Sequence, residues 1–171
     1  AVPVFATADF FTLLLEAVAA FRWELTKTIL GADWNNIANS SLTADYTDYI
    51  QFFKKNRELS QEAKEKLAAE LKRYRGERNM FVNDYTNWVR YESEGVMKLN
   101  KVARAILYRH VPFSKAVRDG LANQPAFSEL QNRLTNIRKK KLHELEIKYR
   151  KYGEPGSLPE VLEENLNFYR V

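Results

Sequence analysis

The chain has no cysteine among its 171 residues. Disulfide bonds, cysteine-ligated zinc, iron–sulfur clusters and thiol nucleophiles are therefore excluded. Glycine and proline are also scarce, with 6 and 5 residues, which disfavours a β fold rich in tight turns. No segment alternates strictly between apolar and polar residues, as a half-buried strand would. These shortages favour a protein built from helices.

Long apolar runs are missing as well. The most apolar stretch, 10–21, is interrupted by Glu16 and is shorter than the roughly 20 residues that a membrane span needs. We therefore expect a protein that is not integral to a membrane. Two interpretations of 10–21 stay open: a helix at the centre of the core, and a helix that contacts other subunits or lies on a membrane.

The first residue is alanine, which either removal of an initiator methionine or cleavage of a signal peptide would leave. The sequence does not decide between a virion or cytoplasmic location and export after signal cleavage.

Helical periodicity covers most of the chain. Apolar residues spaced by three and four predict main helices at 9–30, 44–57, 60–110 and 127–152, with short helices at 114–121 and 158–168. Within 60–110, Gly76 is a candidate kink and Ser93-Glu94-Gly95 a candidate interruption. We expect an all-α fold, an elongated helical bundle of about four main helices plus two short helices. We assign 1–171 to a single domain, with an extended N-terminal arm at 1–8 and a short C-terminal helix and tail at 153–171.

Residues typical of helix ends support these boundaries. The candidates for N-caps are Thr7 or Asp9, Ser60, Ser128 and Ser157. The candidates for C-terminal glycines are Gly31 and Gly153.

Positive charge is concentrated on the predicted helix at 127–152. Its segment 133–151 has a net charge of +6, whereas the whole chain has +5, so the remainder is close to neutral. The cations of this segment are Arg133, Arg138, Lys139, Lys140, Lys141, Lys148, Arg150 and Lys151. A second group is Arg73, Arg75 and Arg78, and a third is Arg104, Arg109, Lys115 and Arg118.

Rows of cations are typical of proteins that bind phosphate backbones without sequence preference. We predict that the first two groups bind nucleic acid or another polyanion. An acidic protein or a membrane surface is the alternative partner, and a helix face that contacts only solvent is the third interpretation.

Signals of enzymatic chemistry are weak. His143 begins His-Glu-Leu-Glu-Ile, in which Ile147 stands where the helical zinc motif needs a second histidine. His110 lies at a predicted helix end, where it would interact with the helix dipole. Glu92 and Glu94 are two residues apart and do not share a helix face, so we expect both in solvent. We predict no enzyme, no metal, no cofactor and no small-molecule substrate.

The resulting hypothesis is a non-enzymatic structural subunit of a larger assembly, such as a filament, a virion coat or a multi-protein complex. Its partners would be copies of itself or sister subunits, because both chain ends are apolar and aromatics make up 13% of the residues. The basic helix would coat nucleic acid. The alternative is an extrinsic or secreted helical-bundle subunit that docks on an acidic protein or membrane complex.

Overall fold

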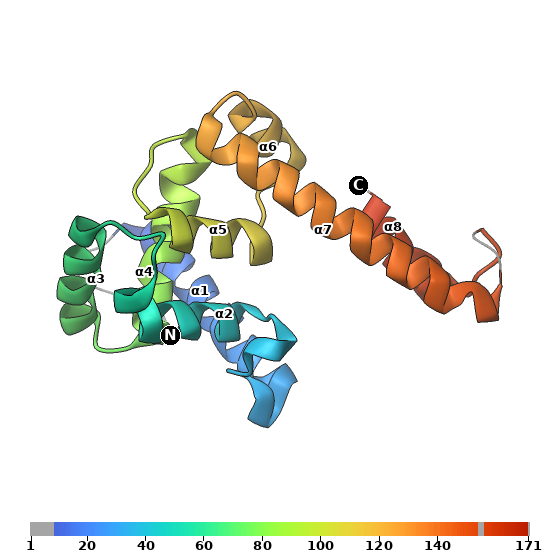
Figure 1. Ribbon diagram of the computed structural model, residues 1–171, viewed down its shortest axis with the longest axis horizontal. Coiled ribbons are helices and arrows are strands. Elements are labelled where there is room, and N and C mark those ends of the chain that lie inside the picture. Colours follow the sequence, from blue (N-terminus) through green and yellow to red (C-terminus); the bar gives the residue numbers. More distant parts are fainter. Residues whose placement is uncertain (1–8, 154–155, 171) are drawn as a thin grey trace. The chain divides into compact units, whose positions relative to one another are not determined.

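The computed structural model describes residues 9–153 and 156–170, so the expected arm at 1–8 lies outside the described residues (Figure 1). The described part contains eight α-helices and no strand, which confirms the all-α prediction. The helices are α1 (Phe10–Leu30), α2 (Leu42–Phe52), α3 (Gln61–Tyr74), α4 (Glu77–Arg90), α5 (Lys101–His110), α6 (Lys115–Leu121), α7 (Pro125–Tyr149) and α8 (Glu160–Arg170).

Most helix ends lie where the sequence places them. The Asp9 carboxylate accepts a hydrogen bond of 2.8 Å from the Thr12 amide, and the Ser60 hydroxyl accepts one of 3.2 Å from the Ala63 amide. These bonds satisfy amides that the first helical turn leaves without backbone partners. The Ser128 cap is wrong, because α7 already begins at Pro125. Proline suits a first helical position, where its missing N–H would have no partner.

The stretch 60–110, predicted as one helix with a candidate kink and a candidate interruption, is broken at both places. It is broken first at Arg75 and Gly76, whose φ angles are 58° and 127°, so the break is complete rather than a kink. It is broken again over 91–100, which confirms the candidate interruption at Ser93-Glu94-Gly95. Here a 3-10 turn at Glu92–Glu94 ends at Gly95 with φ 83°. Three helices, α3, α4 and α5, therefore stand where the periodicity predicts one.

The chain divides into two compact units, Ala1–Leu121 and Ala122–Val171. The first contains α1 to α6 and the second contains α7 and α8. The assignment of 1–171 to a single domain stays a prediction. The two units are defined by their contacts, whereas a domain is defined by cooperative folding.

In the first unit, the core is built around α4. Phe81 on α4 packs against Trp23 of α1 and Tyr46 of α2, with ring centroids 5.3 and 5.4 Å apart. Trp88, two helical turns further along α4, stacks on Phe113 at 3.9 Å and donates a hydrogen bond of 3.0 Å to the Val111 carbonyl. Aromatic rings thus join four segments of the unit through one helix.

In the second unit, α7 and α8 form a helical hairpin (Figure 1). Leu166 of α8 is fully buried against Leu145 and Tyr149 of α7. The side-chain amide of Asn165 donates a hydrogen bond of 2.7 Å to the Tyr149 hydroxyl beside this cluster. The hairpin therefore has a small apolar core of its own.

Candidate functional sites: a basic helix and a polar cleft

Most cations of α7 are exposed, with Arg138 the exception. At 3.6 residues per turn, Arg133, Lys140 and Lys148 fall within roughly 80° of one another, on a different side of the helix from Leu145 and Tyr149. All three are exposed. The hairpin thus buries the apolar face of α7 and leaves ammonium and guanidinium groups exposed on the rest of its surface.

Half of the cations predicted for the helix at 127–152 have neither an ion pair nor an aromatic contact among residues 9–153 and 156–170. These are Lys139, Lys140, Lys148 and Arg150, and all four are exposed. Arg133 pairs with Glu129 at 2.5 Å and Lys141 with Glu144 at 3.7 Å, both on the helix surface, where such pairs are weak.

Two further cations contact aromatic rings. Arg138 is half-buried with its guanidinium 5.2 Å from the Phe168 ring centre, and Lys151 lies 4.8 Å from that of Tyr152. Arg138 therefore has a packing role on the hairpin as well as a charge.

The second predicted group, Arg73, Arg75 and Arg78, lies in the other unit, around the break between α3 and α4. Arg78 is already paired with Glu24 of α1 at 2.8 Å, and the Arg73 guanidinium lies 5.3 Å from the Tyr74 ring centre. Arg75 is exposed at the left-handed position that ends α3. This group offers fewer free cations than the sequence predicts.

The third group is not a surface patch. Arg104 is buried in a two-pronged ion pair with Glu92, with bonds of 2.6 and 3.0 Å, and Arg109 lies 3.4 Å from Asp45. Glu92 is 0% exposed, so its expected place in solvent is wrong. The cause is tertiary: the residue falls in the 3-10 turn that folds back over α5, which no local pattern indicates.

The two histidines fit their sequence-based interpretations. His110 lies in the last turn of α5 with its Nε2 2.8 Å from an Asp45 carboxylate oxygen. His143 is exposed on α7. No group of three or more His, Cys, Asp or Glu side chains suited to a metal ion occurs in the described part of the chain.

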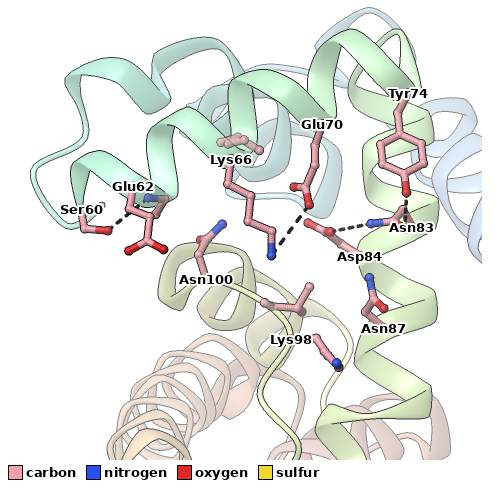
Figure 2. A pocket seen from close by; sticks show the side chains of 13 residues that line it. Ser60, Glu62, Lys66, Glu70, Tyr74, Asn83, Asp84, Asn87, Lys98 and Asn100 are labelled. Carbon is pink, nitrogen blue, oxygen red and sulfur yellow. Dashed lines mark hydrogen bonds and ion pairs between the residues drawn. The ribbon is translucent and has the colours of Figure 1, made fainter.

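A polar cleft of about 500 Å³ lies in the first unit, between α3, α4 and the start of α5 (Figure 2). Lys66 and Glu70 reach into it from α3, toward Asp84 on α4 (Figure 2). The lining residues are Ser60, Glu62, Ala63, Lys66, Leu67, Glu70, Tyr74, Asn83, Asp84, Asn87, Lys98, Leu99 and Asn100.

Asp84 is the most unusual group of this cleft. It is buried, and its carboxylate accepts hydrogen bonds of 2.6 Å from the Tyr46 hydroxyl and 3.3 Å from the Asn83 amide. Burial raises the pKa of Asp84 to about 7; the Tyr46 hydrogen bond opposes this rise and the nearby Glu70 carboxylate adds to it. Near neutral pH this carboxyl can therefore either donate or accept a proton.

The third wall of the cleft is held by the buried Glu92–Arg104 pair. One Glu92 oxygen accepts hydrogen bonds of 2.7 Å from the amides of both Lys98 and Leu99, and Arg104 donates one of 2.7 Å to the Leu99 carbonyl. Asn100 then caps α5, and its side-chain amide donates a hydrogen bond of 2.7 Å to the Tyr49 hydroxyl. The segment 98–100 is thus fixed by bonds to both sides.

The sequence-based predictions do not include this cleft, although the sequence contains one signal for it. The buried face of α4 contains Met80, Phe81, Asp84, Tyr85 and Trp88. A carboxylate at a position of that apolar face indicates a buried polar group that needs partners. Its partner Tyr46 lies 38 residues away, so only the folded chain reveals the pair.

Within the described residues, no helix has both the length and the apolar character needed to cross a bilayer. A family model described as "Domain of unknown function (DUF8509)" matches residues 31–169. No curated protein and no solved structure matches the chain.

Proposed function

We propose that this chain, which belongs to the DUF8509 family of unknown function, is a non-enzymatic helical subunit that binds the phosphate backbone of a nucleic acid through α7. The observation that carries this proposal is the group of exposed cations without ion pairs, Lys139, Lys140 and Lys148 on α7 and Arg150 in the turn that follows it.

The physical basis is the release of counterions. Each cation that meets a phosphate displaces condensed ions from the nucleic acid, which provides affinity without sequence preference. A helix is suited to this role when its other face is anchored, because its cations then hold fixed spacing. In the hairpin, Leu145 and Tyr149 supply that anchor by packing on Leu166.

The test measures binding of a fluorescein-labelled 30-mer, single- and double-stranded, across a salt series. The variant replaces Lys139, Lys140, Lys148 and Arg150 with Gln. We expect the slope of log K against log salt to fall by about 3, since up to four phosphate contacts are lost. A matched control replaces Lys54, Lys55, Arg57 and Lys72, which are exposed cations of the first unit, and should retain the wild-type slope.

The two variants separate the possible outcomes. An equal fall of the slope in both variants would show that binding depends only on net charge, which would contradict a site on α7. Absence of binding by the wild-type chain at low salt would overturn the nucleic-acid proposal. Binding to anionic vesicles or to an acidic protein would then identify the alternative, an extrinsic subunit docking on an acidic protein or membrane complex.

A second candidate function rests on the cleft: binding of a small organic cation. Asp84 and Glu70 both line it, and an ammonium group beside Asp84 would favour its ionised form. We expect 1,4-diaminobutane to bind with release of protons at pH 7, measured by calorimetry in two buffers of different ionisation enthalpy. Its uncharged analogue 1,4-butanediol and the Asp84→Asn variant are the controls. Equal binding of the diol would exclude recognition by charge.

A further inference from the structure

The outer side of α1 carries a continuous apolar stripe, which we define as Phe10, Phe11, Leu14, Val18, Phe21, Leu25 and Ile29. All seven side chains are exposed, with Phe10 at 68%, Phe21 at 67% and Ile29 at 73%. The opposite side of α1 places Leu15, Ala19 and Trp23 in the core of the first unit. The helix is therefore apolar on two opposite sides, of which the described residues cover one.

None of the four charged side chains of α1 belongs to the stripe: Glu16 is exposed elsewhere on the helix, and the other three are engaged within their own unit. Glu24 pairs with Arg78, Arg22 donates a hydrogen bond of 2.9 Å to the His110 carbonyl, and the Lys27 ammonium lies 4.7 Å from the Trp34 ring centre. The stripe thus contains no charge of its own, and it lacks the free cations with which helices that lie on membranes attract anionic lipids.

The spacing of the stripe reads the same in both directions. Its steps from Phe10 through Leu14, Val18, Phe21 and Leu25 to Ile29 are four, four, three, four and four residues. A second α1 running antiparallel would therefore place Phe10 beside Ile29, Leu14 beside Leu25 and Val18 beside Phe21 of its partner. A two-fold contact between identical surfaces requires this self-complementarity.

The area of the stripe suits a stable contact. From their exposed fractions, the seven side chains offer roughly 700 Å² per copy, close to the roughly 800 Å² per partner that specific interfaces bury. This also exceeds the largest apolar patch of a typical monomer.

We infer that two copies of this chain pair through α1, antiparallel, around a two-fold axis that passes between residues 19 and 20. The pairing gives the assembly subunit its first contact with a second copy. It does not depend on the nucleic-acid proposal, because α1 contains none of the proposed phosphate-binding cations.

The absence of cysteine makes the orientation directly testable. Leu14→Cys and Leu25→Cys variants are prepared separately, mixed, and treated with a short bis-maleimide. In the antiparallel pair the mixture yields a cross-linked dimer, while Leu14→Cys alone does not, because its two copies lie about 16 Å apart along the axis at 1.5 Å per residue. Self-cross-linking of Leu14→Cys, or a mixture that stays monomeric, overturns the inference.

A second variant tests the interface without cross-linking. Phe21→Glu is expected to raise the dimer dissociation constant by at least about tenfold in sedimentation equilibrium, with an unchanged helical spectrum. Val161→Glu, at an exposed apolar residue of α8, is the matched control and should remain dimeric. A Phe21→Glu variant that stays dimeric would contradict the inference. So would wild-type chain that is monomeric in solution and sediments only with vesicles, which would assign the stripe to lipid.

Discussion

Tyr46 donates a hydrogen bond of 2.6 Å to Asp84, and this bond joins α2 to α4 at the cleft. Both groups are buried, and burial next to the carboxyl also raises the pKa of the Tyr46 hydroxyl above its usual value. Tyr46 therefore keeps its proton. The buried pair is most stable at low pH, where Asp84 is also protonated.

The Asp84 carboxyl should make folding stability depend on pH. Its pKa is about 7 in the folded chain and 3.8 when unperturbed, so the folded state holds a proton that the unfolded state has lost between these values. The associated stability is complete below about pH 4 and is lost as the pH rises through about 7. The difference amounts to about 4 kcal/mol, at 1.36 kcal/mol per pKa unit.

Urea unfolding at pH 5, 6, 7 and 8 measures this dependence. The Asp84→Asn variant keeps an acceptor for Tyr46 and should show a flatter profile across the series. Asp33→Asn, at an exposed carboxylate, is the control and should reproduce the wild-type profile. A steep fall that persists without the Asp84 carboxyl would assign the dependence to another group.

Breaking the Glu92–Arg104 pair should destabilise the first unit strongly. Glu92→Gln leaves the Arg104 guanidinium buried without a counter-charge, which costs about 3–5 kcal/mol. Arg78→Gln removes the exposed pair with Glu24 and should cost at most about 1 kcal/mol. Denaturant midpoints of the two variants provide the comparison, and equal losses would contradict the structural role of the buried pair.

Two glycine substitutions should have effects of opposite sign. Gly76 has φ 127°, a region that side chains with a Cβ rarely occupy, so Gly76→Ala is expected to destabilise by about 1–3 kcal/mol. Gly120 lies in α6 with open space around it, so Gly120→Ala should stabilise by about 0.4–1 kcal/mol. Thermal melts of both variants check the signs. A Gly76→Ala variant as stable as the wild type would contradict the need for glycine at the α3–α4 break.

Truncation of Leu166 tests whether the hairpin folds as a separate unit. Leu166→Ala removes a fully buried side chain and should cost about 2–5 kcal/mol within the hairpin. Hydrogen exchange should then accelerate in α8 and the adjoining end of α7 while the amides of α4 keep their protection. Equal acceleration in both units would show that they unfold together, as the single-domain prediction expects.

Local chemistry explains which features the sequence predicts correctly. Apolar spacing and capping residues such as Asp9 and Ser60 act within a few residues, so the helices and several of their ends follow from sequence. The break after Tyr74 does not, because Arg75 adopts a left-handed conformation for which its side chain gives no signal. Gly76 is the only local indication, and it fits a kink equally well.

The candidate sites divide in the same way. The α7 cations are adjacent in sequence, so their clustering is visible before folding, whereas the exposure of Lys140 and the half-burial of Arg138 depend on where α8 packs. The cleft depends on contacts between distant residues, of which Tyr46–Asp84 is the clearest. The distinction between Arg104 and the exposed cations likewise requires its partner Glu92 to be placed in space.

The residues that line the cleft occupy one continuous segment of chain, from Ser60 to Asn100. Its three walls are joined by the two-residue break at Arg75 and Gly76 and by the turn around Gly95. Only short loops must close to bring these walls together, so the entropic cost of forming the cleft is small. The long-range bonds of Asp84 to Tyr46 and of Asn100 to Tyr49 form when α2 packs against it. We therefore expect the cleft to assemble early in folding, before α1 and α2 supply the aromatic rings on the other side of α4.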